Sequence, residues 1–298
     1  MISTEEQAKQ FREVLGKKMA YVDEGQGPVV LFLHGNPTSS YIWRNVIPII
    51  AQVARCIAPD LIGMGDSEKI DGTDPDRYSF SEHRKFLSAL IDSLEIGTDL
   101  VLVGQDWGGA LAMDWASKNP AKTRGVVYLE TLIRGRTWAE MDPVVRETFK
   151  RLRSPEGEEL VLQQNVFIEK LLPARMLRKI SAREMDVYRR PFINPGEDRR
   201  PMLTFPRQIP IEGLPEAVAE AVIDYAGWMS SSDTPKLFIN GEPGAILTGT
   251  IRELCRTWKN QEEVTVRGTH FLQEDSPSEI GHAIVDWLSR VPKHALAG

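Results

Sequence analysis

One turn in the first half of the chain carries the residues best suited to covalent chemistry. The apolar run Leu100–Val103 leads into Gly104-Gln-Asp-Trp-Gly108, and a helix-like segment follows. A strand, a sharp turn and a helix in this order can present a nucleophile at the tip of the turn. The central residue, Asp106, carries a carboxylate that is ionised at pH 7 and can attack carbon without a base, giving an ester that water must then cleave. The alternative is that Asp106 only caps the following helix.

A base that could activate this water is found near the C-terminus. His270 follows Val264-Thr-Val-Arg-Gly268 and precedes Phe271, and imidazole is the side chain best suited to take a proton from water near pH 7. The other four histidines fit structural or surface positions. We interpret His34 as a structural residue behind the site, and His83, His282 and His294 as surface residues of helices or of the tail.

Two residues could supply the carboxylate that orients His270. Glu130 ends the apolar run Gly125–Leu129, one strand after the proposed nucleophile, whereas Glu242 follows the run Lys236–Ile239. Each could also be a turn carboxylate bonded to backbone, and the spacing alone does not decide between them.

Two hydrogen-bond donors indicate which leaving group the site would stabilise. Trp107 follows Asp106 directly, and Asn36 lies in the first predicted turn between a strand and a helix. An indole N–H donates without accepting, and an asparagine amide supplies two further N–H bonds. Such a pair could hold a halide as negative charge develops on it, although Trp107 could also be a packing residue and Asn36 a turn former.

Short apolar runs alternate with segments of helical period, which favours a mainly parallel sheet covered by helices on both faces. The predicted strands are Met19–Val22, Val29–Leu33, Arg55–Ala58, Leu100–Val103, Gly125–Leu129, Lys236–Ile239 and Val264–Val266. The predicted core helices are Ser81–Leu94, Gly109–Lys118, Ile251–Lys259 and Pro277–Ser289, the last capped by Ser276 with Glu279 completing a capping box.

The alternation stops between about residues 134 and 233. This window holds helix-like stretches but no strong strand, and a connection of that length should fold as a unit of its own. We therefore predict a core of residues 1–132 and 234–298 and a helical cap of residues 133–233 lying over the carboxyl ends of the strands, where open α/β sheets place their sites. The predicted cap helices are Pro143–Arg153, Glu158–Leu171, Ala182–Arg189 and Pro215–Met229.

Composition limits the classes of partner. The 298 residues contain 36 Lys and Arg against 42 Asp and Glu, a net charge of −6, which disfavours nucleic acid and anionic membranes as general partners. No apolar run is long enough to span a membrane. The polar, acidic N-terminus shows no secretory signal, so we expect a cytoplasmic protein, with the periplasm left open. A monomer is the default expectation. Cys56 and Cys255 are far apart and fit buried free thiols.

Taken together, these motifs make the chain resemble the haloalkane dehalogenases of the α/β-hydrolase superfamily over nearly its whole length. The resemblance is closest to the subgroup whose catalytic acid follows the strand after the nucleophile. The segments that carry it are His34–Asn45, Ala58–Ser67, Gln105–Gly108, Asn240–Ala245 and His270–Pro277.

The resemblance implies an α/β-hydrolase fold with an eight-stranded, mainly parallel sheet and an inserted helical cap. It also implies that Asp106, Glu130 and His270 are catalytic, that Asn36 and Trp107 bind halide, and that their backbone N–H groups form an oxyanion hole. The expected reaction is hydrolysis of a haloalkane to a primary or secondary alcohol, a halide ion and a proton, with no metal or organic cofactor. A detoxifying role would fit this activity.

The family pattern also locates the substrate pocket. Arg175 would lie at the mouth of the access tunnel, where a cation could slow apolar substrates or assist halide exit. Ordinary core packing is the alternative for the apolar residues that the resemblance assigns to the pocket, which are Leu132, Phe149, Phe167, Pro206, Ile246 and Phe271.

Three other functions are compatible with parts of the sequence. An epoxide hydrolase also uses an Asp and a His but needs acid donors, for which the cap offers only Tyr188 and Tyr225. A luciferase related to the dehalogenases would act as an oxygenase on an imidazopyrazinone. A non-catalytic receptor for a hydrophobic ligand would not need the complete set of Asp106, Glu130 and His270.

Overall fold

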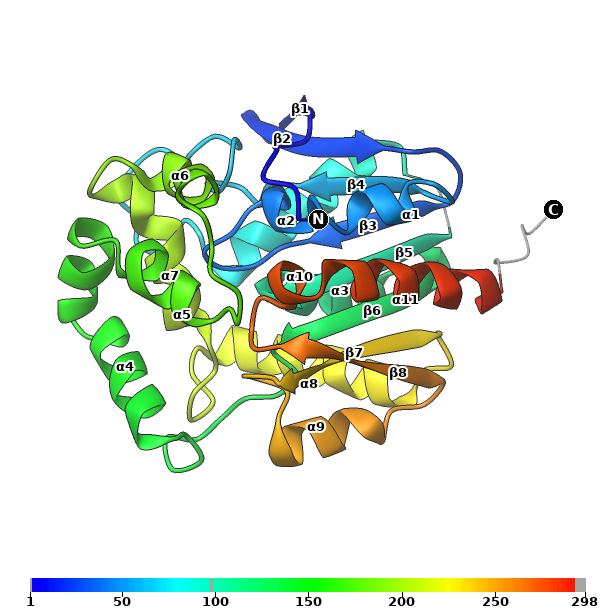
Figure 1. Ribbon diagram of the computed structural model, residues 1–298. Helices are drawn as coiled ribbons and strands as arrows, with labels where there is room; N and C mark the ends of the chain where they lie inside the picture. The colour runs from blue at the N-terminus through cyan, green and yellow to red at the C-terminus, as the bar shows by residue number, and fades with distance from the viewer. Residues whose placement is uncertain (1, 97–98, 293–298) are drawn as a thin grey trace.

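A single twisted sheet forms the centre of the computed structural model, which describes residues 2–96 and 99–292 (Figure 1). Eight strands lie in the order β1-β2-β4-β3-β5-β6-β7-β8, antiparallel from β1 to β4 and parallel from β4 to β8. The strands are β1 (Lys9–Val14), β2 (Lys17–Glu24), β3 (Val29–Leu33), β4 (Arg55–Pro59), β5 (Leu100–Asp106), β6 (Thr123–Thr131), β7 (Lys236–Pro243) and β8 (Gln261–Gly268). This confirms the predicted fold class.

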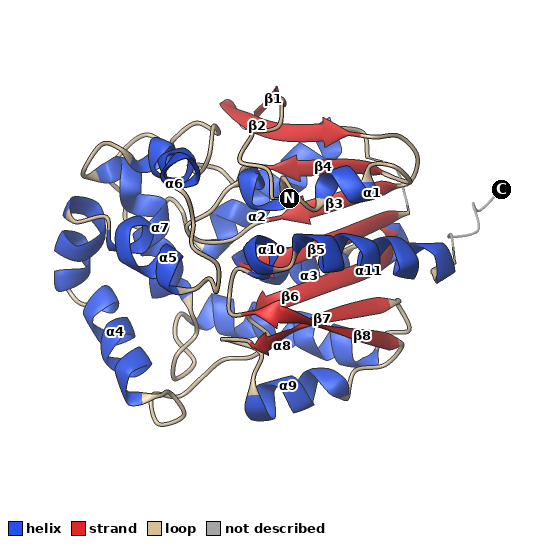
Figure 2. Cartoon of the chain, viewed as in Figure 1, coloured by secondary structure: helices blue, strands red, loops and turns tan. Residues whose placement is uncertain are grey.

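Helices cover both faces of the sheet, as Figure 2 shows in blue around the red strands. The central strands β5 and β6 are buried along almost their whole length, as expected for parallel strands between two helical layers. On one face α1 packs against α11, and on the other α3 packs against both α2 and α8. These core helices are α1 (Ile47–Ile50), α2 (Phe80–Ser93), α3 (Trp107–Lys118), α8 (Glu216–Ser231), α9 (Gly249–Arg256), α10 (Leu272–Asp275) and α11 (Pro277–Arg290).

All seven strands expected from the sequence are present, several of them longer than predicted. The missed strand, β1, is mostly exposed and charged because it lies at the edge of the sheet, so its sequence lacks the apolar signal of a buried strand. The four predicted core helices are confirmed within a few residues.

The predicted cap at the start of α11 is wrong in its detail. Pro277 does occupy the first helical position, but the Ser276 side chain accepts no capping hydrogen bond from the helix. Its hydroxyl instead donates to the backbone carbonyl of Arg267 at 2.7 Å, so Ser276 ties the helix start to the end of β8.

Most of the segment between β6 and β7 is helical and lies beyond the carboxyl ends of the parallel strands, at the left of Figure 1. The helix α7 was not predicted, because the proline within it argues against a helix in the sequence. The helix α8 packs against α3 beside the sheet. The segment's main helices are α4 (Pro143–Arg153), α5 (Leu172–Ala174), α6 (Ala182–Arg189) and α7 (Arg200–Gln208), with π-helical turns at Glu158–Gln163 and Phe167–Leu171.

Two expectations from composition can be compared with the fold. Cys56 and Cys255 are buried free thiols, as predicted. Within residues 2–96 and 99–292, no helix has both the length and the apolar character that a membrane crossing requires.

A buried cluster of charged side chains joins the helical segment to the core. The Arg44 guanidinium, on the core side, donates to Glu274 at 2.6 Å and to Glu184 of α6 at 2.7 Å. Arg178 and the hydroxyl of Tyr188 also donate to Glu274. The side chains of Arg44 and Glu274 are 1% and 0% exposed, so each charge relies on its partners rather than on water.

This cluster gives a prediction about stability. Replacing Glu274 by alanine leaves Arg44 and Arg178 with Glu184 as their one shared carboxylate, so we expect the free energy of unfolding to fall by about 3–5 kcal/mol. Urea denaturation measures this, with Arg256→Ala as the control. Arg256 forms exposed ion pairs, whose loss should cost about 1 kcal/mol or less. A similarly small loss for Glu274→Ala would contradict the account.

Candidate active site

The turn between β5 and α3 holds Asp106 in an unusual backbone conformation. Its φ is 55° and its ψ is −128°, a strained combination for a residue with a side chain. Gly108 allows the turn to pack closely on β3, because a Cβ there would lie 2.2 Å from the carbonyl oxygen of Leu33. Although Asp106 precedes α3, its carboxylate caps no helical N–H. The helix-cap alternative for this side chain is therefore excluded.

The two oxygens of the Asp106 carboxylate have different surroundings. Oδ1 accepts a hydrogen bond of 2.8 Å from the backbone N–H of Asn36, one of the two groups predicted for the oxyanion hole. Gly35 permits this approach, since a Cβ at that position would lie 2.2 Å from Oδ1. Oδ2 lies 3.5 Å from Nε2 of His270. The carboxylate therefore lies between one fixed donor and the imidazole ring.

On its other side the His270 ring faces Glu130. Nδ1 of His270 lies 3.7 Å from Oε2 of Glu130, slightly longer than a hydrogen bond, as catalytic contacts often are before substrate binds. Glu130 is fully buried and accepts hydrogen bonds from the backbone N–H groups of Ala245, Ile246 and Leu247 at 2.9, 2.7 and 3.3 Å.

The second candidate acid lies elsewhere. The Glu242 side chain is 62% exposed and pairs with Arg252 at 3.1 Å. Of the two carboxylates left open by the sequence, only Glu130 is beside His270.

Two opposing effects act on the pKa of His270. Burial lowers it, but the carboxylates of Asp106 and Glu130 favour the charged ring more strongly and raise the pKa to about 9. The two carboxylates on either side therefore favour the imidazolium form of the ring. Loss of charge on Asp106 would remove one of the groups that keeps the proton on the ring.

The two predicted halide donors lie at the same end of the site but are held differently. The Asn36 amide donates one N–H bond to the carbonyl of Met202 at 3.1 Å, which fixes its orientation and leaves its second N–H bond. The Trp107 indole stacks on Phe205 at 5.2 Å between ring centroids and lies 5.7 Å from Phe80. Aromatic packing therefore sets the direction of the indole N–H.

For two other histidines the structure confirms one sequence prediction and contradicts the other. His34 is structural as expected: its Nδ1 contacts the Gly35 carbonyl at 3.0 Å, and its Nε2 accepts from the Leu61 N–H at 2.9 Å. The surface assignment of His83 is wrong, because it is only 1% exposed and stacks on Phe205 at 4.5 Å. The ring thus extends the aromatic stack beneath Trp107.

The remaining two histidines are simpler. His282 is exposed, as predicted. His294 lies outside the described residues.

Reasoning from the sequence missed the role of Gln105. Its side-chain amide lies 3.2 Å from Nε2 of His270 and donates to the His270 carbonyl at 3.1 Å. The hydrogen bond to the carbonyl holds the backbone of His270 from the strand that also carries Asp106. A polar residue in an otherwise buried apolar strand was the signal that could have identified it.

The loop that carries His270 is also held by the helical segment. The carbonyl of Arg175 accepts hydrogen bonds from the Thr269 hydroxyl at 2.6 Å and from the backbone N–H groups of His270 and Phe271 at 3.3 Å. The Asp275 carboxylate in turn accepts from the N–H groups of Leu177 and Arg178 at 2.8 and 3.0 Å. The position of His270 therefore depends on segment 175–178.

A cavity of about 810 Å³ lies between this site and the helical segment. Asn36, Asp106, Trp107 and His270 face it, as do many apolar side chains. The exposed residue Arg175 contributes to the lining. The six residues assigned to the pocket from the sequence all line it, namely Leu132, Phe149, Phe167, Pro206, Ile246 and Phe271. Their contact with a substrate stays a prediction.

Comparisons with known proteins agree with this geometry. Residues 28–277 match the family model described as alpha/beta hydrolase fold. A haloalkane dehalogenase of Sphingobium indicum is 53% identical over 283 residues, which is 95% of this chain and 96% of the relative. The chain belongs to the haloalkane dehalogenase family.

Other members of the haloalkane dehalogenase family match over a similar length. The relative from Mycolicibacterium smegmatis is 48% identical over 95% of this chain and 91% of its own length. Among solved structures, haloalkane dehalogenase DbeA from Bradyrhizobium elkani superposes with a TM-score of 0.91 at 42% identity, covering 95% of this chain and 98% of that one. These matches confirm the α/β-hydrolase fold and the family resemblance seen in the motifs.

The charge arrangement in this dehalogenase gives a pH prediction. If the Asp106 carboxylate helps to hold His270 protonated, Asp106→Asn should lower the pKa of His270 from about 9 toward the value of about 6.5 for a free imidazole. The imidazole resonances in NMR spectra recorded against pH measure this. His83, whose pKa burial lowers to about 3, should remain neutral throughout and provides an internal control. A pKa for His270 that is unchanged or raised in the variant would contradict the account.

Proposed function

We propose that this chain hydrolyses haloalkanes to an alcohol, a halide ion and a proton through a covalent ester on Asp106. The observation that supports this most is the position of the Asp106 carboxylate. It faces a largely apolar cavity, with His270 at 3.5 Å on one side and the indole of Trp107 next to it in the lining. The relatives named haloalkane dehalogenase support the same activity.

In the first step an Asp106 oxygen attacks the carbon that bears the halogen. The carbon–oxygen bond forms as the carbon–halogen bond breaks, and the halogen leaves with the bonding electron pair. The Trp107 indole N–H and the free N–H of the Asn36 amide would donate to the departing halide. Donors oriented in advance stabilise developing charge without reorganising, and they act more strongly where water is excluded.

Loss of charge on Asp106 prepares the second step. The ester no longer stabilises the imidazolium, so the pKa of His270 falls and the ring releases its proton to solvent. The neutral ring then takes a proton from water as the water oxygen attacks the ester carbonyl carbon. The backbone N–H of Asn36, which already donates to Oδ1, would stabilise the oxyanion.

Collapse of this intermediate completes the reaction. The bond between the carbonyl carbon and the alkyl oxygen breaks, and the alkoxide takes the proton of the hydroxyl group that came from water. The products are the alcohol and the Asp106 carboxylate, and His270 is left protonated. Glu130 stabilises the imidazolium, and Gln105 and segment 175–178 hold the ring in place. One haloalkane and one water give one alcohol, one halide and one proton. We also expect a cytoplasmic monomer, in which one chain supplies all of the active-site residues named here.

The structure disfavours the epoxide alternative. The Tyr188 hydroxyl donates to Glu274, and the Tyr225 hydroxyl donates to the Leu132 carbonyl at 2.7 Å. Neither tyrosine lines the cavity, so neither can protonate the oxygen of an opening epoxide ring there.

Bromide release tests the proposed activity. The wild type should release bromide from 1-bromobutane or 1,2-dibromoethane, whereas Asp106→Ala should release none, because it has no nucleophile. Asp224→Asn removes an exposed carboxylate on α8 and should retain the wild-type rate. Folding of each variant is checked by circular dichroism. Absence of bromide from the folded wild type with both short and longer substrates would contradict the proposal.

A further inference from the structure

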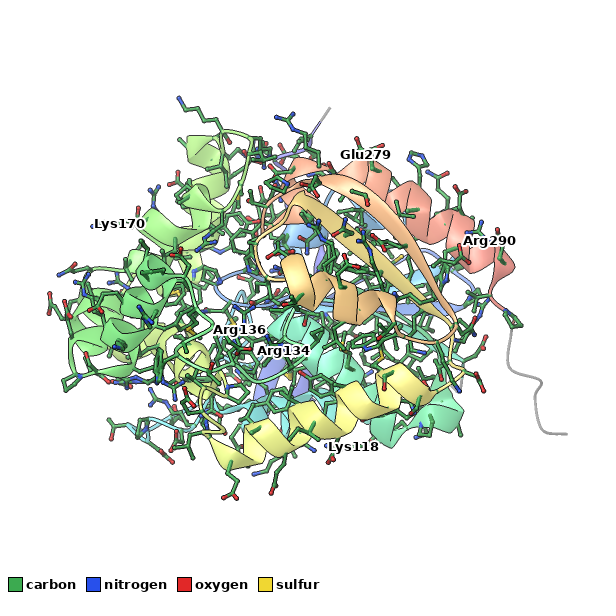
Figure 3. The ribbon with its side chains drawn as sticks, turned by 90° about the horizontal axis from the view of Figure 1, so that it is seen from below. Lys118, Arg134, Arg136, Lys170, Glu279 and Arg290 are labelled. Atoms are coloured by element: carbon green, nitrogen blue, oxygen red, sulfur yellow. The ribbon has the colours of Figure 1, made fainter. Side chains whose placement is uncertain are left out.

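Besides Arg175, two arginines that are close in the sequence interrupt the apolar wall of the cavity. Arg134 and Arg136 follow β6, on the segment that leads from the core to α4, and both line the cavity. Figure 3 labels them at the junction between the cap helices and the core. Neither residue has a part in the displacement or in the hydrolysis. A haloalkane without polar groups offers a cation nothing to bind.

The charge of Arg134 is already matched. Its guanidinium donates to both oxygens of Glu140 at 3.2 and 3.0 Å and to the Gly135 carbonyl at 2.9 Å. The other carboxylate in this part of the lining, Asp142, accepts from the N–H groups of Val144 and Val145 at the start of α4. Both acidic side chains here therefore have partners other than Arg136.

Arg136 has no such partner. Its guanidinium makes one long contact, from Nη2 to the Ile246 carbonyl at 3.5 Å. Among residues 2–96 and 99–292, no carboxylate forms an ion pair with it. Burial and the neighbouring charge of Arg134 lower its pKa, partly offset by Glu140 and Glu130. A half-buried guanidinium with so few protein partners has N–H groups left to bind an anion.

The backbone holds Arg136 in place beside the cavity. Its N–H donates to the Pro210 carbonyl at 3.0 Å, and its own carbonyl accepts from the Glu212 N–H at 2.9 Å. A short bridge to Ile211 forms between these bonds. The guanidinium therefore projects from a fixed support, which reduces the entropy lost when it binds a ligand.

Arg136 is also close to the catalytic residues. Ile246 accepts the Arg136 contact through its carbonyl, and its N–H donates to Glu130 at 2.7 Å. With ordinary backbone bond lengths, the guanidinium nitrogen lies within roughly 10 Å of the Glu130 carboxylate. Arg136 and Asp106 both line the same cavity, so an extended molecule in it can contact Arg136 with one end and Asp106 with the other.

We propose that Arg136 binds the anionic end of a bifunctional substrate, an ω-haloalkanoate whose carbon–halogen bond lies at Asp106. The carboxylate would accept two parallel N–H bonds from the guanidinium, the geometry in which arginine binds carboxylates most strongly. This rests on the proposed dehalogenase function and adds a class of substrate to it.

The first test compares charged and neutral substrates of matched length. We measure kcat/KM of the wild type and of Arg136→Met for 6-bromohexanoate and 1-bromohexane, and for 8-bromooctanoate and 1-bromooctane. In Arg136→Met the ratio of the charged to the neutral substrate should fall about tenfold to hundredfold, the range expected for a lost hydrogen bond between charged groups. An unchanged ratio would overturn the proposal, while bromide release from 1-bromohexane would leave the dehalogenase function intact.

Two further variants separate charge from folding. Arg136→Lys keeps a cation and should recover part of the ratio, although lysine cannot form the paired contact. Arg151→Met removes an exposed cation of α4 that pairs with Glu156 outside the cavity and should leave the ratio at the wild-type value. If Arg151→Met lowered the ratio as much as Arg136→Met, a general field of the cap and not Arg136 would be responsible.

A binding experiment tests the same site without turnover. In calorimetry, hexanoate should bind the wild type at least tenfold more tightly than hexan-1-ol, and Arg136→Met should remove the difference. Equal binding of hexanoate by wild type and variant would overturn the proposal, even in a protein that releases no bromide. Sodium bromide is titrated in parallel. If the variant lost affinity for bromide as strongly as for hexanoate, Arg136 would bind released halide and the proposal would be wrong.

Discussion

The carboxylate of Asp106 has to remain charged, exposed to substrate and correctly directed inside a largely apolar cavity. One oxygen meets this demand through the backbone N–H of Asn36, and the other faces the ring of His270. To direct its carboxylate in this way, Asp106 adopts a strained backbone conformation in the turn between β5 and α3. The pairing of β5 with β3 and with β6 holds this turn in place. Much of the remaining structure supports these two contacts or the ring that makes the second.

The support for His270 comes from three separate parts of the chain. Gln105 contacts it from β5, Glu130 faces it at the end of β6, and the carbonyl of Arg175 holds its backbone from the helical segment. The ion-pair cluster around Glu274 lies only four residues beyond and joins the same segment to the core. The stability of the interface between the helical segment and the core is therefore coupled to the placement of His270, because both depend on one loop.

The sequence predicted most of the fold because buried parallel strands have a strong apolar signal, and β5 and β6 show it along almost their whole length. The predictions from the sequence failed where that apolar signal is absent or ambiguous. β1 is an exposed edge strand, α7 contains proline, and His83 looked like a surface residue although it packs beneath Trp107 through Phe205. Ser276 has a common capping pattern but donates to Arg267, a tertiary contact that no local pattern contains.

Within the site, residue types and turns indicated the candidates for the nucleophile, the base and the halide donors, and the structure brings these residues together around one cavity. The choice between Glu130 and Glu242 needed three-dimensional positions, because it depends on which carboxylate is buried beside His270. The same is true of Gln105 and of Arg136, whose neighbours come from distant segments. Long-range contacts of this kind fix orientation and charge, and spacing along the chain does not determine them.

The central claim is that Asp106 forms a covalent ester which His270 then helps water to cleave. The most direct measurement is mass spectrometry of His270→Gln after incubation with 1-bromobutane, followed by peptide mapping. We predict that the protein gains one butyl group and that the peptide containing Asp106 carries it, whereas the wild type shows little adduct at steady state. Bromide release by this variant without any adduct, or an adduct on another residue, would contradict the account.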